Sequence, residues 1–326
     1  QRGTQRIVGY YQSRKNFGFV VPDNERFLQD IFVPAERSKG AVTGHKVVVE
    51  ITDYGSERKK PEGKVVEILG HINDPGTDIL SVVRAYNLPV EFPEKVLNQV
   101  ERVSNEVSTA DMAGRMDIRD WQTVTIDGED AKDLDDAITL TREGERYRLG
   151  VHIADVSHYV KPGSELDNEA FHRATSVYYA DQVVPMLPKQ LSNGICSLNE
   201  GVLRLAFSCL MRLDKDGNLT DYRFVKSVIR SRVKGVYSEI NALLAGSADD
   251  ELKGKYHEVL AQLPAMKELY GHRARLRKER GCMDIESGDV KLILDENGHC
   301  IDVKKRTSGE SEAMIEEFML LAYQCA

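Results

Sequence analysis

Six carboxylates crowd into ten consecutive positions in the first half of this chain. The segment from Asp127 to Asp136 reads Asp-Gly-Glu-Asp-Ala-Lys-Asp-Leu-Asp-Asp and follows the strand-like run 122–126. Carboxylates this close raise one another's pKa values, so a folded loop of this kind either holds a hard divalent cation or stays fully solvated. The first expectation is a site for Mg²⁺, or for Mn²⁺ in its place.

Two alternatives to a catalytic metal loop can be tested on the same residues. An EF-hand needs Gly at its sixth position and Glu at its twelfth, but counting from Asp127 these are Lys132 and Ile138. A solvated acidic loop is the common alternative. Three apolar residues, however, interleave with the aspartates: Ala131, Leu134 and Ala137. Part of the segment must therefore be packed, and its carboxylates can converge on one or two ions to polarise a phosphate and a water.

Strands and helices mix around the acidic segment, which predicts a mixed α+β domain over 121–326. We expect strands at 122–126, 137–141, 147–154, 204–212, 222–233 and 290–295. We expect helices near 167–173, twice within 238–281, and from Glu310 onward. The acidic loop then lies between the first two strands of this domain.

The first 70 residues follow a different pattern, in which short runs rich in Val, Ile, Phe and Tyr alternate with turn residues. These runs are 7–12, 18–21, 30–33, 45–52 and 63–69. Five short strands of this spacing predict a small β-barrel. A connector over 71–120 follows, with a helix expected at 93–107 because Pro93 suits a first helical turn and apolar residues then recur at helical spacing.

Aromatic residues on neighbouring strands of the barrel could bind nucleic acid. Phe17, Phe19 and Phe32 come from its second and third strands, and Lys15 lies nearby. Aromatic rings stack on bases while cations hold phosphates, so the set favours single-stranded nucleic acid. The alternative is that these rings fill the barrel core, where aromatics are normally found.

Composition limits the class of protein. The chain has 326 residues, 41% of them hydrophobic, and a net charge of −8, which divides into +3 for residues 1–70 and −11 for the remainder. Two soluble domains fit this length, and the mildly basic first part could contact a polyanion. The five cysteines lack any C-x-x-C spacing, which argues against disulfide and zinc frameworks. No run is apolar enough to span a membrane or resemble a signal peptide, so a cytoplasmic location is expected.

The string from Val124 to Ala137 resembles the signature of the RNase II/RNase R exoribonuclease family, especially its RNase R branch. In that family an aspartate is followed six, eight and nine residues later by three more, here Asp127, Asp133, Asp135 and Asp136. Four further segments resemble the family: 150–160, 175–179, 184–188 and 191–199. The barrel resembles a cold-shock domain, an oligonucleotide-binding (OB) fold, and the resemblance covers about residues 4–321.

The resemblance implies a processive exoribonuclease that degrades single-stranded RNA from its 3′ end to 5′-mononucleotides with Mg²⁺. Asp127 and Asp136 would be the principal metal ligands. Asp135 would hold a second ion or orient the attacking water, and Asp133 would complete the cluster.

The same resemblance implies three RNA contacts outside the barrel. Tyr178 matches the family tyrosine that stacks on the terminal nucleotide. Tyr237 is a similar candidate for a base-stacking clamp, and Glu316 for a contact to a ribose hydroxyl. No role is assigned to His152, His158 and Asp155, because hydrogen-bonded structural histidines are common. The cations of the basic helix end 272–281 could contact RNA phosphates, but they are explained equally well by the helix dipole.

The chain departs from the family in extent. It lacks a preceding cold-shock domain and the later catalytic segment with its arginine and glutamate, and it ends without an S1 barrel, as a fragment would. Two alternatives therefore stay open: an RNA-binding module without activity, and, more distantly, a Mg²⁺ phosphohydrolase of another fold. Protein partners are not indicated by any motif.

Overall fold

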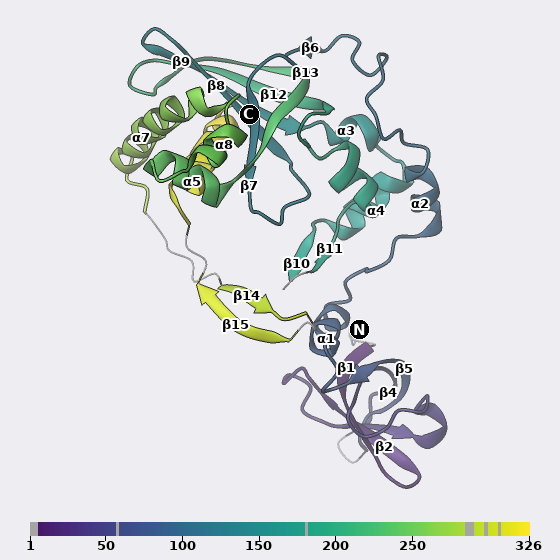
Figure 1. Cartoon of the computed structure of the whole chain (residues 1–326). Coiled ribbons are helices and arrows are strands. Elements are labelled where there is room, and N and C mark those ends of the chain that lie inside the picture. The colour runs from purple at the N-terminus through teal and green to yellow at the C-terminus, as the bar shows by residue number, and fades with distance from the viewer. Residues whose placement is uncertain (1–5, 57–58, 180–181, 284–289, 297–298, 306–307) are drawn as a thin grey trace. The chain divides into compact units, whose positions relative to one another are not determined.

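The computed structural model describes residues 6–56, 59–179, 182–283, 290–296, 299–305 and 308–326. The chain forms two compact units (Figure 1). The first contains residues 1–90, 177–184 and 290–304, and the second contains 91–176, 185–289 and 305–326. In the part of the chain described, no helix is both long and apolar enough to cross a membrane. The cytoplasmic location stays a prediction.

The first unit contains the expected five-stranded barrel. Its strands run in the closed order β1-β2-β3-β5-β4. Their bounds are Arg6–Ser13 (β1), Phe17–Pro22 (β2), Ile31–Pro34 (β3), His45–Asp53 (β4) and Glu62–His71 (β5). Alternate residues of these strands point inward, and the barrel core consists of Ile7, Tyr11, Val20, Ile31, Val33, Val47, Val49, Ile51 and Val65 with Ala41. Gly18 is required because a Cβ there would lie 2.3 Å from the Tyr11 hydroxyl oxygen.

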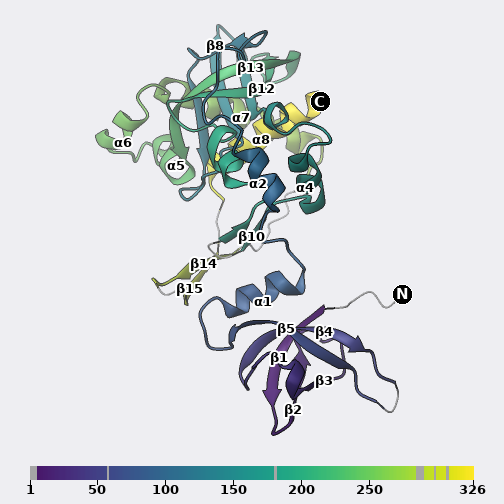
Figure 2. The ribbon, with the colours of Figure 1, turned by 90° about the vertical axis from the view of Figure 1, so that its right-hand side faces the viewer.

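Helix α1 (Thr77–Ala85) was not expected from the sequence. Its N-cap is Gly76 in the left-handed conformation, with no side-chain capping bond, so the usual start signal is missing. The helix lies beside the barrel (Figure 2), in contact with β1, β4 and β5. The first unit also contains two hairpins, β10 (Val177–Tyr179) with β11 (Gln182–Val184), and β14 (Val290–Leu294) with β15 (Cys300–Lys305).

The second unit is built on a six-stranded sheet in the order β12-β9-β8-β7-β13-β6. The strands are β6 (Met116–Asp117), β7 (Thr123–Asp127), β8 (Asp136–Glu143), β9 (Arg146–Ala154), β12 (Leu203–Leu213) and β13 (Leu219–Val236). β13 pairs with β12 over its first two thirds and with β7 over its last residues, so five strands close on themselves. The mixed α and β architecture agrees with the sequence prediction.

Seven α-helices accompany this sheet among the described residues: α2 (Glu94–Val100), α3 (Val156–Tyr159), α4 (Glu165–Arg173), α5 (Tyr237–Ala245), α6 (Asp250–Lys255), α7 (Leu263–Glu279) and α8 (Glu310–Cys325). The main core lies between the sheet and α5, α7 and α8, which Figure 1 shows grouped together. It includes Leu149 and Met211 of the sheet and Phe318 of α8.

Two helix predictions were wrong in extent. The helix expected over 93–107 ends at Val100, because Ser104 forms a local turn in which its hydroxyl bonds the amide and carbonyl of Glu106. Residues 238–281 contain three α-helices instead of two. Asp249 caps a separate short helix, since its carboxylate accepts from the Leu252 amide at 2.8 Å.

Candidate active site and RNA-binding surface

The β7–β8 hairpin carries the acidic loop. Asp127 is the last residue of β7 and Asp136 the first of β8, so the strands themselves place these two carboxylates. Leu134 is 2% exposed and packs with Ala137 in a small core that also contains Ile229. The expectation that part of the acidic segment is packed is therefore confirmed.

The four aspartates influence one another electrostatically. Burial raises the pKa of Asp136 to about 6, and the charges of Asp127 and Asp135 add to this effect. Burial also raises the pKa of Asp135, with further contributions from Asp133 and Asp127. Asp135 is exposed at the surface, whereas Asp136 is half-buried. The fold thus gathers these carboxylates into one region of negative potential.

The donor set fits a hard divalent cation, which prefers carboxylate oxygens and would offset this repulsion. Within the described ranges, however, no three His, Cys, Asp or Glu side chains converge into a ready-made metal site. The assignment of Asp127, Asp133, Asp135 and Asp136 as ligands of Mg²⁺ therefore stays a prediction.

Two residues that the sequence analysis missed hold the backbone of the acidic loop. The Ser197 hydroxyl accepts from the Leu134 amide at 3.0 Å. The Lys234 ammonium donates to the carbonyl of Ala131 at 2.8 Å. They lie 63 and 103 residues away from their partners along the chain, so no local sequence signal could have identified them.

Phe17, Phe19 and Phe32 form an aromatic platform on the barrel surface. Their ring centroids lie 5.5–5.9 Å apart, and none of the three belongs to the buried core of the barrel. The alternative that these rings fill the core is therefore wrong. Lys60, which the sequence analysis missed, places its ammonium 4.7 Å from the Phe19 ring centroid, and Lys15 is exposed. The arrangement suits base stacking beside cations.

Comparison with known families identifies two domains along the chain. The RNB domain model matches residues 115–326. This chain belongs to the RNB-domain family. The cold shock domain model matches residues 19–93, within the barrel and the segment after it. The resemblance to RNase II and RNase R, expected from the aspartate spacing, is confirmed.

Individual relatives of the RNB-domain chain are ribonucleases R. Ribonuclease R of Thermotoga maritima is 45% identical over 325 residues, which is 99% of this chain and 46% of that protein. Mycoplasma genitalium RNase R in complex with double-stranded RNA has a TM-score of 0.91 at 28% identity, over 99% of this chain and 56% of that chain. The same protein in complex with ribose methylated single-stranded RNA also has a TM-score of 0.91, over 99% and 50%. The chain spans about half the length of these relatives.

The other predicted RNA contacts lie on separate elements. Tyr178 is on β10 and is 64% exposed. Tyr237 begins α5, in the RNB domain, and packs partly buried against the main core. Glu316, on α8, accepts from Arg277 Nη1 at 3.0 Å. Their roles toward RNA stay predictions.

The basic helix end 272–281 has structural partners on α8. Arg273 is buried and its Nε lies 3.5 Å from the Glu317 carboxylate, which is also buried. Arg277 Nη1 lies 3.6 Å from the same side chain. These pairs join α7 to α8, so at least two of the cations in this segment stabilise the RNB domain itself.

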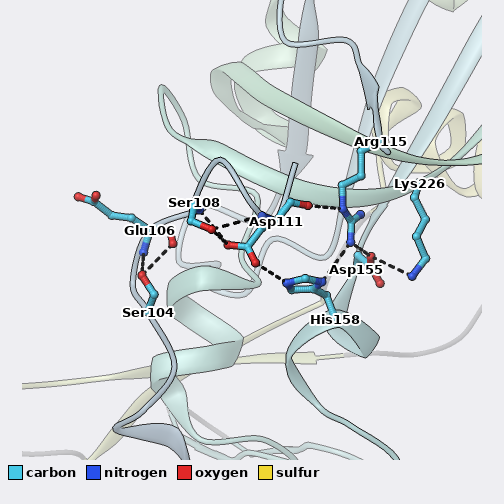
Figure 3. Close-up of polar contacts among 8 residues, drawn as sticks. All are labelled: Ser104, Glu106, Ser108, Asp111, Arg115, Asp155, His158 and Lys226. Carbon is cyan, nitrogen blue, oxygen red and sulfur yellow. Dashed lines mark hydrogen bonds and ion pairs between the residues drawn. The ribbon is translucent and has the colours of Figure 1, made fainter. Parts of the chain in front are cut away.

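A charged network supports the chain where it enters the RNB domain (Figure 3). Arg115 Nη2 donates to Asp155 Oδ2 at 2.6 Å, and Lys226 Nζ lies 3.8 Å from the same oxygen. His158 bridges the network, since its Nε2 lies 2.9 Å from Asp111 Oδ1 and its Nδ1 lies 3.3 Å from Arg115 Nη2. Burial alone would raise the pKa of Asp155, but hydrogen bonds from Ser157 and Arg115 lower it overall.

His152 is a structural histidine, in agreement with the common reading of such residues. Its ring is fully buried, its Nδ1 shares a hydrogen bond of 2.7 Å with Ser208 Oγ, and its Nε2 contacts Thr139 Oγ1. Burial lowers its pKa to about 3. The ring is therefore neutral at physiological pH and is placed to stabilise the sheet.

Proposed function

We propose that this chain acts as part of a 3′→5′ exoribonuclease that removes 5′-mononucleotides from single-stranded RNA with a divalent cation. The observation that carries the proposal is the β7–β8 hairpin of a matched RNB domain, on which burial and neighbouring carboxylates at the family spacing raise the pKa values of Asp135 and Asp136. We assign residues 1–70 to RNA binding, 71–120 to a connector with a helix, and 121–326 to the catalytic domain.

In this mechanism Asp127 and Asp136, at the two strand ends, would hold Mg²⁺ or Mn²⁺. The cation, when bound, polarises the terminal phosphate and neutralises charge that develops on it. Asp135 would orient the attacking water or hold a second ion, and Asp133 would complete the cluster. Water adds to phosphorus, the 3′ oxygen of the preceding nucleotide leaves with a proton, and the products are a 5′-mononucleotide and an RNA shorter by one residue.

RNA recognition in the proposal rests on stacking. The aromatic platform of Phe17, Phe19 and Phe32 would bind bases along the strand, with Lys15 and Lys60 beside it. Tyr178 would stack on the terminal nucleotide, and Tyr237 and Glu316 would add a base contact and a ribose contact. Stacking accepts every base, so little sequence preference is expected. RNase R of Mycoplasma genitalium has been solved with RNA bound, which supports RNA as the ligand class.

Digestion of a 5′-labelled single-stranded RNA with Mg²⁺ tests the proposal. The wild-type chain should produce a ladder that shortens from the 3′ end. Asp135→Asn should abolish the ladder, whereas Asp130→Asn removes an equal charge from the same loop outside the family spacing and should retain it. Cleavage by both variants would contradict the assignment of Asp135.

Binding without cleavage is the informative alternative outcome. If the wild-type chain retains the RNA in a gel-shift experiment but leaves its length unchanged, the chain is an RNA-binding module and its catalytic assignment fails. If it neither binds nor cleaves RNA but hydrolyses a small phosphate ester with Mg²⁺, the function is that of a phosphohydrolase.

A further inference from the structure

The acidic loop is irregular between its two strands. Residues 128–135 form neither helix nor strand, although both flanking segments pair in the sheet. An irregular loop with several carboxylates should open under their mutual repulsion unless something restrains its backbone. The hydrogen bonds made by this backbone therefore decide whether the carboxylates stay close.

Ser197 restrains the C-terminal part of the loop. Its side chain is fully buried, and its hydroxyl accepts from the Leu134 amide at 3.0 Å while donating to the Lys132 carbonyl at 2.9 Å. The neighbouring Leu198 amide donates to the Leu134 carbonyl at 2.9 Å. Ser197 is itself anchored, because Arg204 Nε donates to its carbonyl at 2.7 Å.

Lys234 restrains the N-terminal part of the loop from strand β13. Its ammonium donates to the Ala131 carbonyl at 2.8 Å and to the Glu129 carbonyl at 3.2 Å. Over the described ranges, no ion pair joins this ammonium to a carboxylate. Holding a long lysine side chain in one geometry costs conformational entropy, so this placement is best explained by the two backbone carbonyls that it holds in the loop.

The restraints from Ser197 and Lys234 share one property. They bind the loop through its backbone at residues 129, 131, 132 and 134, and none of these bonds uses a carboxylate oxygen. The contacts from Ser197 and Lys234 thus hold the loop without themselves occupying an aspartate oxygen. Outer partners that orient ligands without competing for the ion are what a metal site requires.

We propose that Lys234 and Ser197 are positioning residues for a divalent cation on the acidic loop. They hold the loop backbone so that Asp133 and Asp135 face Asp127 and Asp136. This inference rests on the metal site of the proposed function and adds to it the two residues that preorganise that site. Neither residue touches RNA or the reacting phosphate in this assignment.

The affinity of the full chain for Mn²⁺ tests the inference without relying on activity. Free Mn²⁺ can be followed by its electron paramagnetic resonance signal during titration. We expect Lys234→Met to weaken binding about tenfold or more, the range typical of outer-shell partners, and Lys234→Arg, which keeps the donors, to restore most of the affinity. Lys253→Met is the matched control, because Lys253 lies on α6, away from the acidic loop, and pairs with the exposed Asp250.

Two comparisons make the result decisive. Thermal unfolding in the presence of a chelator should show that Lys234→Met remains folded at the titration temperature. If that variant does not fold, Ser197→Ala replaces it, with the same expected loss of Mn²⁺ affinity. Mn²⁺ affinity equal to the wild-type value in folded Lys234→Met, or in folded Ser197→Ala where that variant replaces it, would overturn the positioning role.

The titration also separates this inference from the proposed metal site. If Asp136→Asn loses Mn²⁺ binding while Lys234→Met keeps it, the metal site stands and the positioning role fails. If the wild-type chain and Asp136→Asn bind Mn²⁺ equally, or neither binds it, the metal site itself fails and the inference fails with it.

Discussion

Arg115 and Asp155 form an ion pair of 2.6 Å in which both side chains are almost fully buried, at 5% and 3% exposure. Arg115 precedes β6, whereas Asp155 directly follows β9. The pair therefore joins the chain entering the RNB domain to the end of a central strand. Asp155 also accepts from the Ser157 hydroxyl at 2.7 Å, which helps to offset the cost of burying its charge.

Removing one partner of this pair should destabilise the domain strongly. Arg115→Met leaves the Asp155 carboxylate buried without its main partner, which typically costs about 3–5 kcal/mol. We expect a lower urea midpoint for this variant. Arg119→Met is the matched control, since Arg119 also pairs at 2.6 Å, with Asp117, but on the surface, where such pairs contribute little. If both variants lost the same amount of stability, burial would not explain the effect of the Arg115–Asp155 pair.

The stability of the RNB domain should depend on pH through His152. Its folded-state pKa is about 3, below the value of about 6.5 expected in the unfolded chain. The unfolded state therefore binds the proton more readily. The contribution of neutral His152 to the free energy of unfolding is fully present above pH 6.5 and is lost progressively as the pH falls toward 3.

His152→Gln should remove this part of the pH dependence. Between pH 7.5 and 5.5 the wild-type chain should lose about 1 kcal/mol more stability than the variant, although the variant is less stable at every pH because it alters a buried hydrogen-bonded site. Urea unfolding at both pH values measures the difference. His257→Gln is the control, because it removes an imidazole from an exposed position. If the stability of His152→Gln and of the wild type fell equally between the two pH values, the prediction would be disproved.

The aromatic platform should contribute to RNA affinity but not to barrel stability. Phe17→Ala or Phe19→Ala should weaken binding of a single-stranded oligonucleotide by about 1–3 kcal/mol per stacked base. Fluorescence anisotropy with a labelled RNA measures this loss. Leu28→Ala is the control, because Leu28 is an apolar barrel residue at 92% exposure outside the platform. A melting temperature lowered in parallel with affinity would indicate a packing role instead.

Much of the fold could be predicted from local patterns. The five barrel strands were expected within two residues of their observed ends, since alternation of apolar residues reports which side of a strand is buried. Helices were predicted less well: α1 lacks a capping side chain, and α2 ends early where Ser104 forms a competing turn. A short-range hydrogen bond thus accompanies the early end of α2, whereas the usual start signal is absent at α1.

The sequence by itself determined the spacing of Asp127, Asp133, Asp135 and Asp136, and with it the family and the expected metal chemistry. Only the tertiary structure decided what holds these carboxylates together. Ser197 and Lys234 reach the loop across more than 60 residues, and Arg115 reaches Asp155 across 40. Such contacts depend on how β9, β12 and β13 close the sheet. Pairing between strands far apart in the chain produces no local sequence pattern around the residues that it brings together.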